Sequence, residues 1–293
     1  MKELTTHLGI IGGSGLYSID GIDSVTESDI MTPFGRPSDS VVTGILAGRK
    51  ISFLPRHGKG HRLLPSEVNS KANIWALKSL GVTHIVSVSA VGSLVESYKP
   101  GDIVVPDSII DRTTGHRPHT FFGNGLVGHV SLADPYCDEL RKWLIASANQ
   151  SLRDVSTHID GVYLCIEGPR FSTRAESHLY RQFGATVIGM TAMPEAALAR
   201  EAEIAYATLA FITDYDCWHE VEEDVSVAAV LAILKKNVEA SKKVIGHLAE
   251  TIPLVSANSI FESARFALMT DPELVPLETK RSLEPLYGKY WKE

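Results

Sequence analysis

Residues 66–93 read SEVNSKANIWALKSLGVTHIVSVSAVGS, in which a helical pattern passes directly into a strand pattern. Ser66 is placed to cap a helix over residues 66–80, and Gly81 is placed to end it. Residues 82–89 are rich in β-branched side chains and predict a buried strand, which is expected to give way to a turn at residues 90–93. A helix followed at once by a strand is typical of an α/β sheet.

The same alternation continues along the rest of the chain. Thr173 and Glu176 match a capping box, and Pro194 suits the first turn of a helix. Further strands are expected at residues 8–11, 51–54, 186–188 and 206–213, and further helices at residues 173–184, 194–203 and 226–250. No repeat or flexible linker interrupts the pattern. We therefore predict an α/β fold, a single domain over residues 1–293 with a mixed, mostly parallel twisted sheet and helices on both faces.

Polar and glycine-rich segments fall just after several of the expected strands. Ligands of open α/β sheets bind at the carboxyl ends of the strands, so these segments are expected to meet at one edge and form a site. They are Gly12 to Gly15, Arg56-His57, Ser89 to Ser93, Met190-Thr191 and Asp214 to Asp216.

The charge balance limits the partners. The chain carries 28 Lys and Arg against 35 Asp and Glu, a net charge of -7. Nucleic acids and anionic membranes attract clustered basic residues, so we expect neither as a partner. A small anionic substrate stays possible because one local pocket can be basic on an acidic protein.

The cysteines indicate a reducing compartment. They are three in number and scattered, so they form no disulfide framework and no zinc motif. The first residues, MKELTTHLGIIGG, lack the basic and apolar regions of a signal peptide. We expect a cytoplasmic protein without a metal site; the cysteines are Cys137, Cys165 and Cys217.

Two of the segments suit an anion. Glycines at residues 12–15 let backbone N–H groups approach a phosphate, and Ser14 adds a hydroxyl. Arg56 offers a guanidinium for bidentate recognition, with His57 beside it. A plain tight turn and a solvated surface loop explain the same residues equally simply. Residues 89–93 likewise read as a second phosphate cradle or as a strand-to-loop turn.

The segment at Asp214 to Asp216 and a separate loop, Glu167 to Phe171, suit a flat polar ligand. Asp214 and Asp216 are two residues apart after a strand, where like charge and burial raise the pKa of one carboxyl and keep it protonated. Phe171 offers an aromatic face to a base. The simpler alternatives are a solvated turn for the aspartates and a core anchor for Phe171.

Taken together, these segments resemble the purine nucleoside phosphorylase superfamily, and most closely its methylthioadenosine phosphorylase branch. The resemblance spans roughly residues 8–235 in family order. The tail from about Ser256 does not match the family pattern, and Ser14 and Ser89 stand where the family often has Thr. The stretches that carry it are GIIGGSGLY, PRHGKGHRLLPSEVNSKANIWALKSLGV, SAVGSL, KPGDIVVPDSIIDRTTG, IEGPRFSTRAES, MTAMPEAALAREA and TDYDCWHE.

The resemblance implies a role for each matching residue. Asp214 and Asp216 face the adenine edge and are the expected catalytic carboxyls, with Asp214 donating a proton to the leaving purine. His129 reaches a neighbouring subunit, because this branch forms homotrimers with shared active sites. The implied phosphate site is Ser14, Arg56, His57, Ser89, Ala90 and Thr191; the other implied nucleoside contacts are Phe171, Met190, Val227 and Val230.

The implied activity is phosphorolysis of 5′-methylthioadenosine to adenine and 5-methylthioribose 1-phosphate, in purine and methionine salvage. Inorganic phosphate is a co-substrate, and no cofactor is expected. Two other functions stay open: a phosphorylase of 6-oxopurine nucleosides or methylthioinosine, and a purine nucleoside-binding module without activity. A dinucleotide-dependent oxidoreductase is disfavoured, because the glycine fingerprint at residues 12–15 lacks its third glycine.

Overall fold

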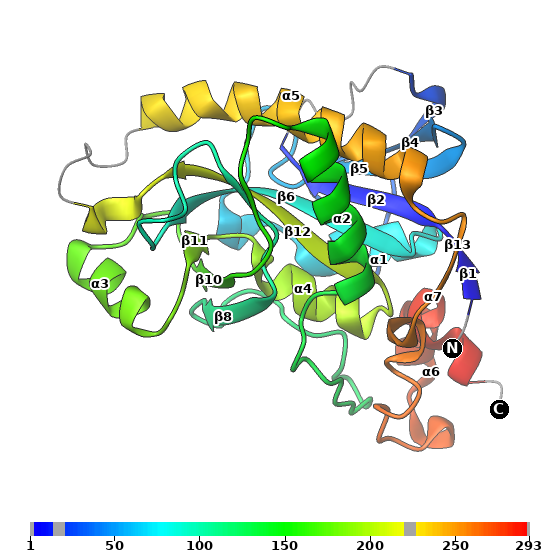
Figure 1. Cartoon of the computed structure of the whole chain (residues 1–293). Helices are drawn as coiled ribbons and strands as arrows, with labels where there is room; N and C mark the ends of the chain where they lie inside the picture. Colours follow the sequence, from blue (N-terminus) through cyan, green and yellow to red (C-terminus); the bar gives the residue numbers. More distant parts are fainter. Residues whose placement is uncertain (1–2, 14–20, 220–226, 292–293) are drawn as a thin grey trace.

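A mixed eleven-stranded sheet forms the centre of the molecule in the computed structural model (Figure 1). The structure describes residues 3–13, 21–219 and 227–291, and of residues 227–235 the backbone alone. The strands are β1 (Glu3–Thr5), β2 (His7–Gly12), β3 (Asp23–Ser28), β4 (Val41–Leu46), β5 (Arg49–Pro55), β6 (His84–Ser93), β7 (Ile103–Val104), β8 (Ser108–Arg112), β9 (Thr157–His158), β10 (Val162–Ile166), β11 (Val187–Gly189), β12 (Ala205–Asp214) and β13 (Val255–Ala257). The α-helices are α1 (Ser70–Ser79), α2 (Asp138–Ser151), α3 (Arg174–Gln182), α4 (Ala192–Glu201), α5 (Val227–Thr251), α6 (Leu277–Ser282) and α7 (Glu284–Tyr287).

Four parallel strands at the middle of this sheet set the position of the site. Strand β2 lies between β5 and β6 and runs parallel to both. Strand β12 pairs with the other side of β6, again in parallel. The carboxyl ends of β2, β5, β6 and β12 therefore meet at one edge, as the sequence predicts.

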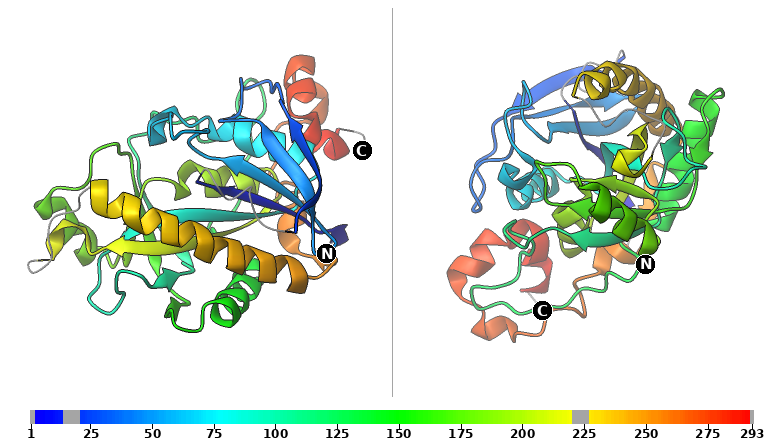
Figure 2. Two further views of the ribbon diagram at one scale, coloured as in Figure 1. Left: turned by 90° about the horizontal axis from the view of Figure 1, so that it is seen from above. Right: turned by 90° about the vertical axis from the view of Figure 1, so that its left-hand side faces the viewer.

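Helices cover both faces of the sheet, which confirms the predicted layers (Figures 1 and 2). Helices α2 and α5 pack together over one face, and their apolar side chains share a core with β2, β5 and β12. Helices α1 and α4 pack over the other face with a second core cluster. No helix among the described residues is long and apolar enough to cross a membrane.

The predicted start of the helix at Ser66 is wrong. Residues Pro65–Glu67 form a separate 3-10 turn, and α1 begins at Ser70. Asn69 is the cap, because its side chain accepts a hydrogen bond from the Ala72 N–H at 3.1 Å. The predicted end is confirmed, since Gly81 follows the helix at φ +86°, a conformation that favours glycine.

The predicted turn at residues 90–93 is also wrong, because β6 continues through Ser93. Its last residues pair with β12 on one side and with β11 on the other, at Ser93 and Gly92. These partners come from distant parts of the chain, so the local pattern of small residues at 90–93 did not reveal the strand. The other predicted strands and helices are present, with ends shifted by a few residues at most.

The C-terminal segment packs onto the same core as the rest of the chain. Strand β13 pairs antiparallel with β1. The indole N–H of Trp75 in α1 donates to the Ser282 carbonyl at 2.8 Å, and Tyr287 of α7 is fully buried in the cluster around α1 and α4. The C-terminal helices project at one end of the molecule beside α1 (Figures 1 and 2). The prediction of one domain stays a prediction that agrees with this packing.

Candidate active site

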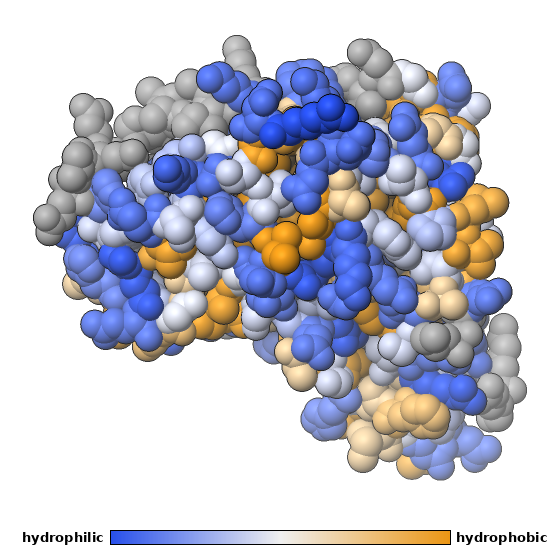
Figure 3. All heavy atoms as spheres, in the orientation of Figure 1, coloured by the Kyte–Doolittle hydropathy of each residue, from blue (hydrophilic) through white to orange (hydrophobic). Residues whose placement is uncertain are grey.

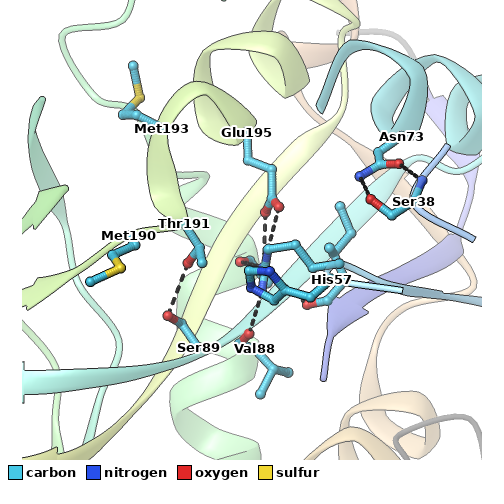
Figure 4. A network of polar contacts seen from close by, with 12 residues as sticks. Ser38, His57, Asn73, Val88, Ser89, Met190, Thr191, Met193 and Glu195 are labelled. Atoms are coloured by element: carbon cyan, nitrogen blue, oxygen red, sulfur yellow. Dashed lines mark hydrogen bonds and ion pairs between the residues drawn. The ribbon is translucent and has the colours of Figure 1, made fainter. Parts of the chain in front are cut away.

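Three hydroxyl groups meet at the carboxyl end of the sheet, and Figure 4 shows two of them, those of Ser89 and Thr191. Ser89 Oγ lies 3.1 Å from Thr191 Oγ1 and 3.2 Å from the Tyr163 hydroxyl, and the Tyr163 hydroxyl lies 3.3 Å from Thr191 Oγ1. Ser89 and Tyr163 are buried, and Thr191 is partly exposed. The structure thus brings together Ser89 and Thr191, two residues that the sequence predicts for one anion site.

Thr191 reaches this place by a route that the sequence did not predict. Strand β11 runs antiparallel to β6, with Val187 opposite Ser93 and Ile188 opposite Gly92. The chain leaving β11 therefore runs back along β6 toward Ser89. Thr191 is the residue before α4, and its side chain makes no capping hydrogen bond to that helix.

Arg56 follows β5 and lies in a buried polar network beside these hydroxyls (Figure 4). Its Nε donates to Glu195 Oε1 at 2.6 Å, its Nη2 to Glu195 Oε2 at 3.1 Å, and its Nη1 to the Val88 carbonyl at 2.9 Å. Burial favours the neutral guanidine, but the Glu195 carboxylate outweighs it and raises the pKa of Arg56 above its ordinary value. Arg56 is a fixed positive charge at this edge of the sheet.

His57 is a neutral imidazole. Burial and, to a smaller extent, the positive charge of Arg56 together lower its pKa to about 4. Its Nδ1 lies 2.9 Å from the Leu63 carbonyl oxygen, which accepts hydrogen bonds only, so Nδ1 carries the proton. Nε2 of the neutral ring is then an acceptor, able to take a hydrogen bond from a protonated oxyanion.

The two aspartates lie against the end of β6. Asp214 Oδ1 accepts from the Asp216 N–H at 2.8 Å, and its Oδ2 accepts from Thr213 Oγ1 at 2.6 Å. Gly92 permits this approach, since a Cβ there would lie 2.8 Å from Asp214 Oδ1 and 3.3 Å from the Asp216 Cβ. Asp214 is partly exposed and Asp216 is buried. Burial, with a contribution from the Asp214 charge, raises the pKa of Asp216.

The strand β6 sets the distance between the hydroxyl cluster and the aspartates. Ser89 and Gly92 are three residues apart on this strand, about 10 Å at the usual rise of a strand. That distance leaves room for a sugar between an anion at Ser89 and a flat base at Asp214.

A loop held by Arg117 and Glu167 leads to Ser172, whose carbonyl accepts from Cys217 Sγ at 3.2 Å, next to Asp216 in the chain. Arg117 Nε donates to Glu167 Oε1 at 2.9 Å, and its Nη1 donates to the Met190 carbonyl at 2.8 Å. A Cβ on Gly168 would lie 2.5 Å from Met190 Sδ, so Met190 packs directly against the loop. Phe171 at the end of the loop is 48% exposed, which is unlike a core anchor.

The predicted capping box after this loop is present. Thr173 Oγ1 accepts from the Glu176 N–H at 3.2 Å, and Glu176 Oε2 accepts from the Thr173 N–H at 2.7 Å. Arg170 pairs with the same Glu176 carboxylate on the surface, at 2.7 Å to each oxygen. The residues around Phe171 are thereby fixed without burying the ring.

Five other predicted site residues lie apart from these contacts or outside the described side chains. Ser14 lies outside the described residues, as do the side chains of Val227 and Val230 in the first turns of α5. His129 is exposed, and its backbone N–H donates to the Ala267 carbonyl at 2.9 Å, so it borders the C-terminal segment. Ala90 lies within β6 opposite Phe211.

Sequence reasoning missed Glu195, Arg117 and Tyr163. Glu195 had a usable signal, since it is an acidic residue within the otherwise apolar stretch MPEAALA and such a charge needs a buried partner. Arg117 and Tyr163 gave none, because each acts through contacts with distant segments.

The arrangement suits transfer of a group between an oxyanion and a flat leaving group. One end offers a fixed cation and hydroxyls to the oxyanion, and the other offers paired carboxyls and an aromatic face. No cluster of three or more His, Cys, Asp or Glu in the described part of the chain is arranged to hold a metal ion.

Comparison with known proteins gives consistent matches. The sequence model of the phosphorylase superfamily matches residues 7–250. The S-methyl-5′-thioadenosine phosphorylase of Geobacter sulfurreducens is 53% identical over 283 residues, which cover 97% of this chain and 98% of that protein.

Solved structures match as well. A methylthioadenosine phosphorylase from an antarctic soil metagenomic library has a TM-score of 0.90 at 50% identity, covering 96% of this chain and 99% of the other. The methylthioadenosine phosphorylase of Schistosoma mansoni in complex with adenine has a TM-score of 0.79 at 41% identity, covering 84% and 92%.

Proposed function

The chain belongs to the phosphorylase superfamily, and from that premise we propose that it cleaves 5′-methylthioadenosine with inorganic phosphate, giving adenine and 5-methylthioribose 1-phosphate. It is therefore a pentosyltransferase. The observation that carries this function is similarity over nearly the whole chain to enzymes named for that substrate. The geometry of the sheet edge supports it independently, since it supplies one end for an anion and one for a base.

Phosphate is proposed to bind at the buried end. Arg56 supplies the positive charge, and Ser89 and Thr191 supply hydroxyl donors 3.1 Å apart. Neutral His57 accepts a hydrogen bond from the protonated oxygen of phosphate through Nε2. Ser14 and the backbone at Ala90 complete the proposed site. Bound in this way, phosphate is held in place to attack the anomeric carbon, and its charge stabilises the cationic sugar of the transition state.

The purine is proposed to bind at the open end. Its ring lies against Phe171, its sugar against Met190, and its polar edge faces Asp214. A purine leaves poorly unless its developing negative charge is neutralised, and a proton shared with N7 does this. Asp216 is the member of the pair whose pKa burial raises, so it holds a proton more readily than an exposed carboxyl. We propose that the pair supplies this proton, with Asp214 making the contact to the base.

The experiment compares substrates at saturating phosphate. Release of free base is followed from 5′-methylthioadenosine, adenosine and inosine. We expect 5′-methylthioadenosine to have the highest kcat/KM, since Val227 and Val230 are proposed to offer an apolar wall to its 5′ group. A preference for inosine would make the protein a 6-oxopurine nucleoside phosphorylase. Binding of all three without release of base would make it a binding module.

We also propose that the protein is a homotrimer with shared active sites. His129 is exposed beside an apolar surface patch formed by Val127, Phe266, Met269, Leu274 and Leu277, of which Phe266 is 88% exposed. The Met269 N–H donates to the Val127 carbonyl at 2.9 Å, which ties the His129 segment to the C-terminal segment. Figure 3 shows apolar side chains on the C-terminal lobe, at the lower right. A patch of this kind suits burial against another copy of the chain.

Light scattering at micromolar concentration tests the assembly. A mass of three chains is expected for the wild type. A Phe266→Asp variant should dissociate, because it places a charge in the proposed interface, and should lose activity together with the assembly. A wild type that is only monomeric contradicts the proposal.

A cytoplasmic role in purine and methionine salvage fits the proposed reaction. The proposed reaction returns a free purine base and a sulfur-containing sugar phosphate to metabolism. Cys137, Cys165 and Cys217 are free thiols, which suits a reducing compartment.

A further inference from the structure

The guanidinium of Arg56 makes several hydrogen bonds within the protein, more than are needed to keep an arginine near a bound anion. Besides its two bonds to Glu195 and its bond to the Val88 carbonyl, Nη2 donates to Ser87 Oγ at 2.6 Å. Arg56 is 4% exposed and Glu195 is 1% exposed. Burying a charged pair this deeply costs desolvation free energy. The pair is therefore stable only if its contacts have good geometry and its other polar atoms are hydrogen-bonded.

The partners of Arg56 do not use all of its N–H groups. A guanidinium has five N–H groups. Glu195, Ser87 and Val88 take four of them, and Nη2 also lies 3.4 Å from the Ile11 carbonyl oxygen. Within the described residues the second N–H of Nη1 has no partner. Nη1 is the nitrogen bonded to the Val88 carbonyl, and Ser89 is the next residue. The unused N–H therefore belongs to the nitrogen that contacts the residue before Ser89, and it is the N–H left for a ligand.

Glu195 is itself fixed from two further directions. The Tyr206 hydroxyl donates to Oε2 at 3.0 Å, and the main chain of Glu195 lies in α4. Thr191 is the residue that precedes α4, four positions before Glu195. One short segment thus places both a hydroxyl of the phosphate site and the carboxylate that orients the arginine (Figure 4).

We propose that Glu195 is a positioning residue for phosphate: it does not touch the anion, but it holds Arg56 so that one N–H of Nη1 faces phosphate. This rests on the proposed function, because it takes Arg56 as the phosphate cation. Without the carboxylate the guanidinium keeps its charge but loses its fixed orientation. Phosphate binding should then suffer far more than nucleoside binding.

Glu195→Gln is the main test, because the amide keeps the shape and removes the charge. Loss of a charge-assisted orientation should raise the phosphate KM about 10- to 100-fold. The 5′-methylthioadenosine KM should change less than about 3-fold. Tyr206→Phe is the matched control, since it removes a hydrogen bond to the same carboxylate while leaving the ion pair intact. Because Tyr206 also holds this carboxylate, the phosphate KM of the variant should rise, but much less than that of Glu195→Gln.

Three results would overturn the proposal. They are an unchanged phosphate KM in folded Glu195→Gln, equal rises of its phosphate KM and its nucleoside KM, and a rise of the phosphate KM in Tyr206→Phe as large as that in Glu195→Gln. If Glu195→Gln does not fold, Ser87→Ala decides, since it removes another acceptor of Nη2 without stranding a charge. It should raise the phosphate KM and leave the nucleoside KM alone, and an unchanged phosphate KM would reject the role.

A binding readout separates this proposal from the proposed function. Phosphate should raise the Tm of the wild type, because a ligand that binds only the folded state stabilises it. The rise should be much smaller for Glu195→Gln at the same phosphate concentration. If the wild type shows the Tm rise but no phosphorolysis, the proposed function fails while the role of Glu195 stands. If the variant shows the full rise, the positioning role fails whatever the activity.

Discussion

Of the three arginine–glutamate pairs at the candidate site, the two with bidentate contacts differ most in burial, while Arg117 and Glu167 form a third, largely buried pair. Arg56 and Glu195, at the proposed phosphate end, are buried and share their contacts with Ser87, Val88 and Tyr206. Arg170 and Glu176, at the base end, are bidentate too but lie at the surface. The two ends of the site are thus built from the same kind of pair in opposite environments.

The difference shows how the two ends work. A buried charge needs its partners, so we expect the proposed phosphate end to be rigid before any ligand arrives. The proposed base end keeps Phe171 exposed, and its loop is held by the Arg117–Glu167 pair and by a capped helix. Substitutions at the phosphate end should therefore affect folding and phosphate binding together, whereas those at the base end should affect the nucleoside alone.

Arg56→Ala should have the largest effect. It leaves the Glu195 carboxylate buried without its partner, which typically costs about 3–5 kcal/mol of unfolding free energy. The phosphate KM of the surviving folded protein should rise strongly while the nucleoside KM changes little. Urea unfolding and steady-state kinetics measure both.

Arg170→Ala is the matched control at the base end. The same bidentate pair is broken there, but water replaces the lost partner, so the unfolding midpoint should stay close to that of the wild type. Similar losses of stability in the two variants would remove the proposed difference between the ends.

Asp214→Asn should have the next largest effect. The amide cannot share a proton with N7, so kcat/KM for adenine nucleosides should fall by about 10²-fold or more. Because an amide suits a 6-oxo base better, inosine should improve relative to 5′-methylthioadenosine. Equal losses on the two substrates would leave Asp214 with a structural role only.

Phe171→Ala should have a smaller effect. Loss of an aromatic contact of about 0.5–1.5 kcal/mol should raise the nucleoside KM roughly 2- to 12-fold. The phosphate KM and the Tm should stay unchanged, because the ring packs into no core. A loss of stability comparable with that of Arg56→Ala would place Phe171 in the core instead.

The smallest expected effect is on the pH dependence of stability, through the titration of His57. Its pKa is lowered to about 4 in the folded state from the ordinary 6.5, so the unfolded chain takes up the proton first as the pH falls. The stability it contributes is present above pH 6.5 and is lost as the pH falls toward 4. Because the ring is partly exposed, its contribution to the free energy of unfolding should change by well below about 1.4 kcal/mol per pH unit.

His57→Asn removes this titration. An asparagine amide can still donate to the Leu63 carbonyl, so the fold should tolerate the change. Unfolding curves at pH 7 and pH 5 should show a smaller loss for the variant than for the wild type. An equal loss would mean that His57 is protonated alike in both states.

Much of the fold could be predicted from local patterns. The capping box at Thr173, the stop at Gly81 and the proline at 194 each act through neighbouring residues, so the sequence alone reveals them. The cap of α1 was misplaced because Ser66 and Asn69 both suit the role, and only Asn69 is bonded to the helix. The C-terminal packing depends on contacts such as Trp75 with Ser282, which no local pattern encodes.

The sequence predicts several residues of the candidate site, but not the residues that hold them in place. The sequence indicated Arg56, Ser89 and Thr191 because they follow strands or match a family pattern. It did not indicate the carboxylate that holds Arg56, since Glu195 is 139 residues away in the chain. The same holds for the reversal of β11 that carries Thr191 to Ser89, which depends on antiparallel pairing with β6.

The most direct test of the account identifies the sugar product of 5′-methylthioadenosine with and without inorganic phosphate. A rigid anion site beside an open base site predicts adenine and 5-methylthioribose 1-phosphate in equal amounts, with negligible adenine when phosphate is left out. Adenine released at the same rate without phosphate, together with free 5-methylthioribose, would contradict the account. The buried end would then not be a phosphate site, and the protein would be a hydrolase.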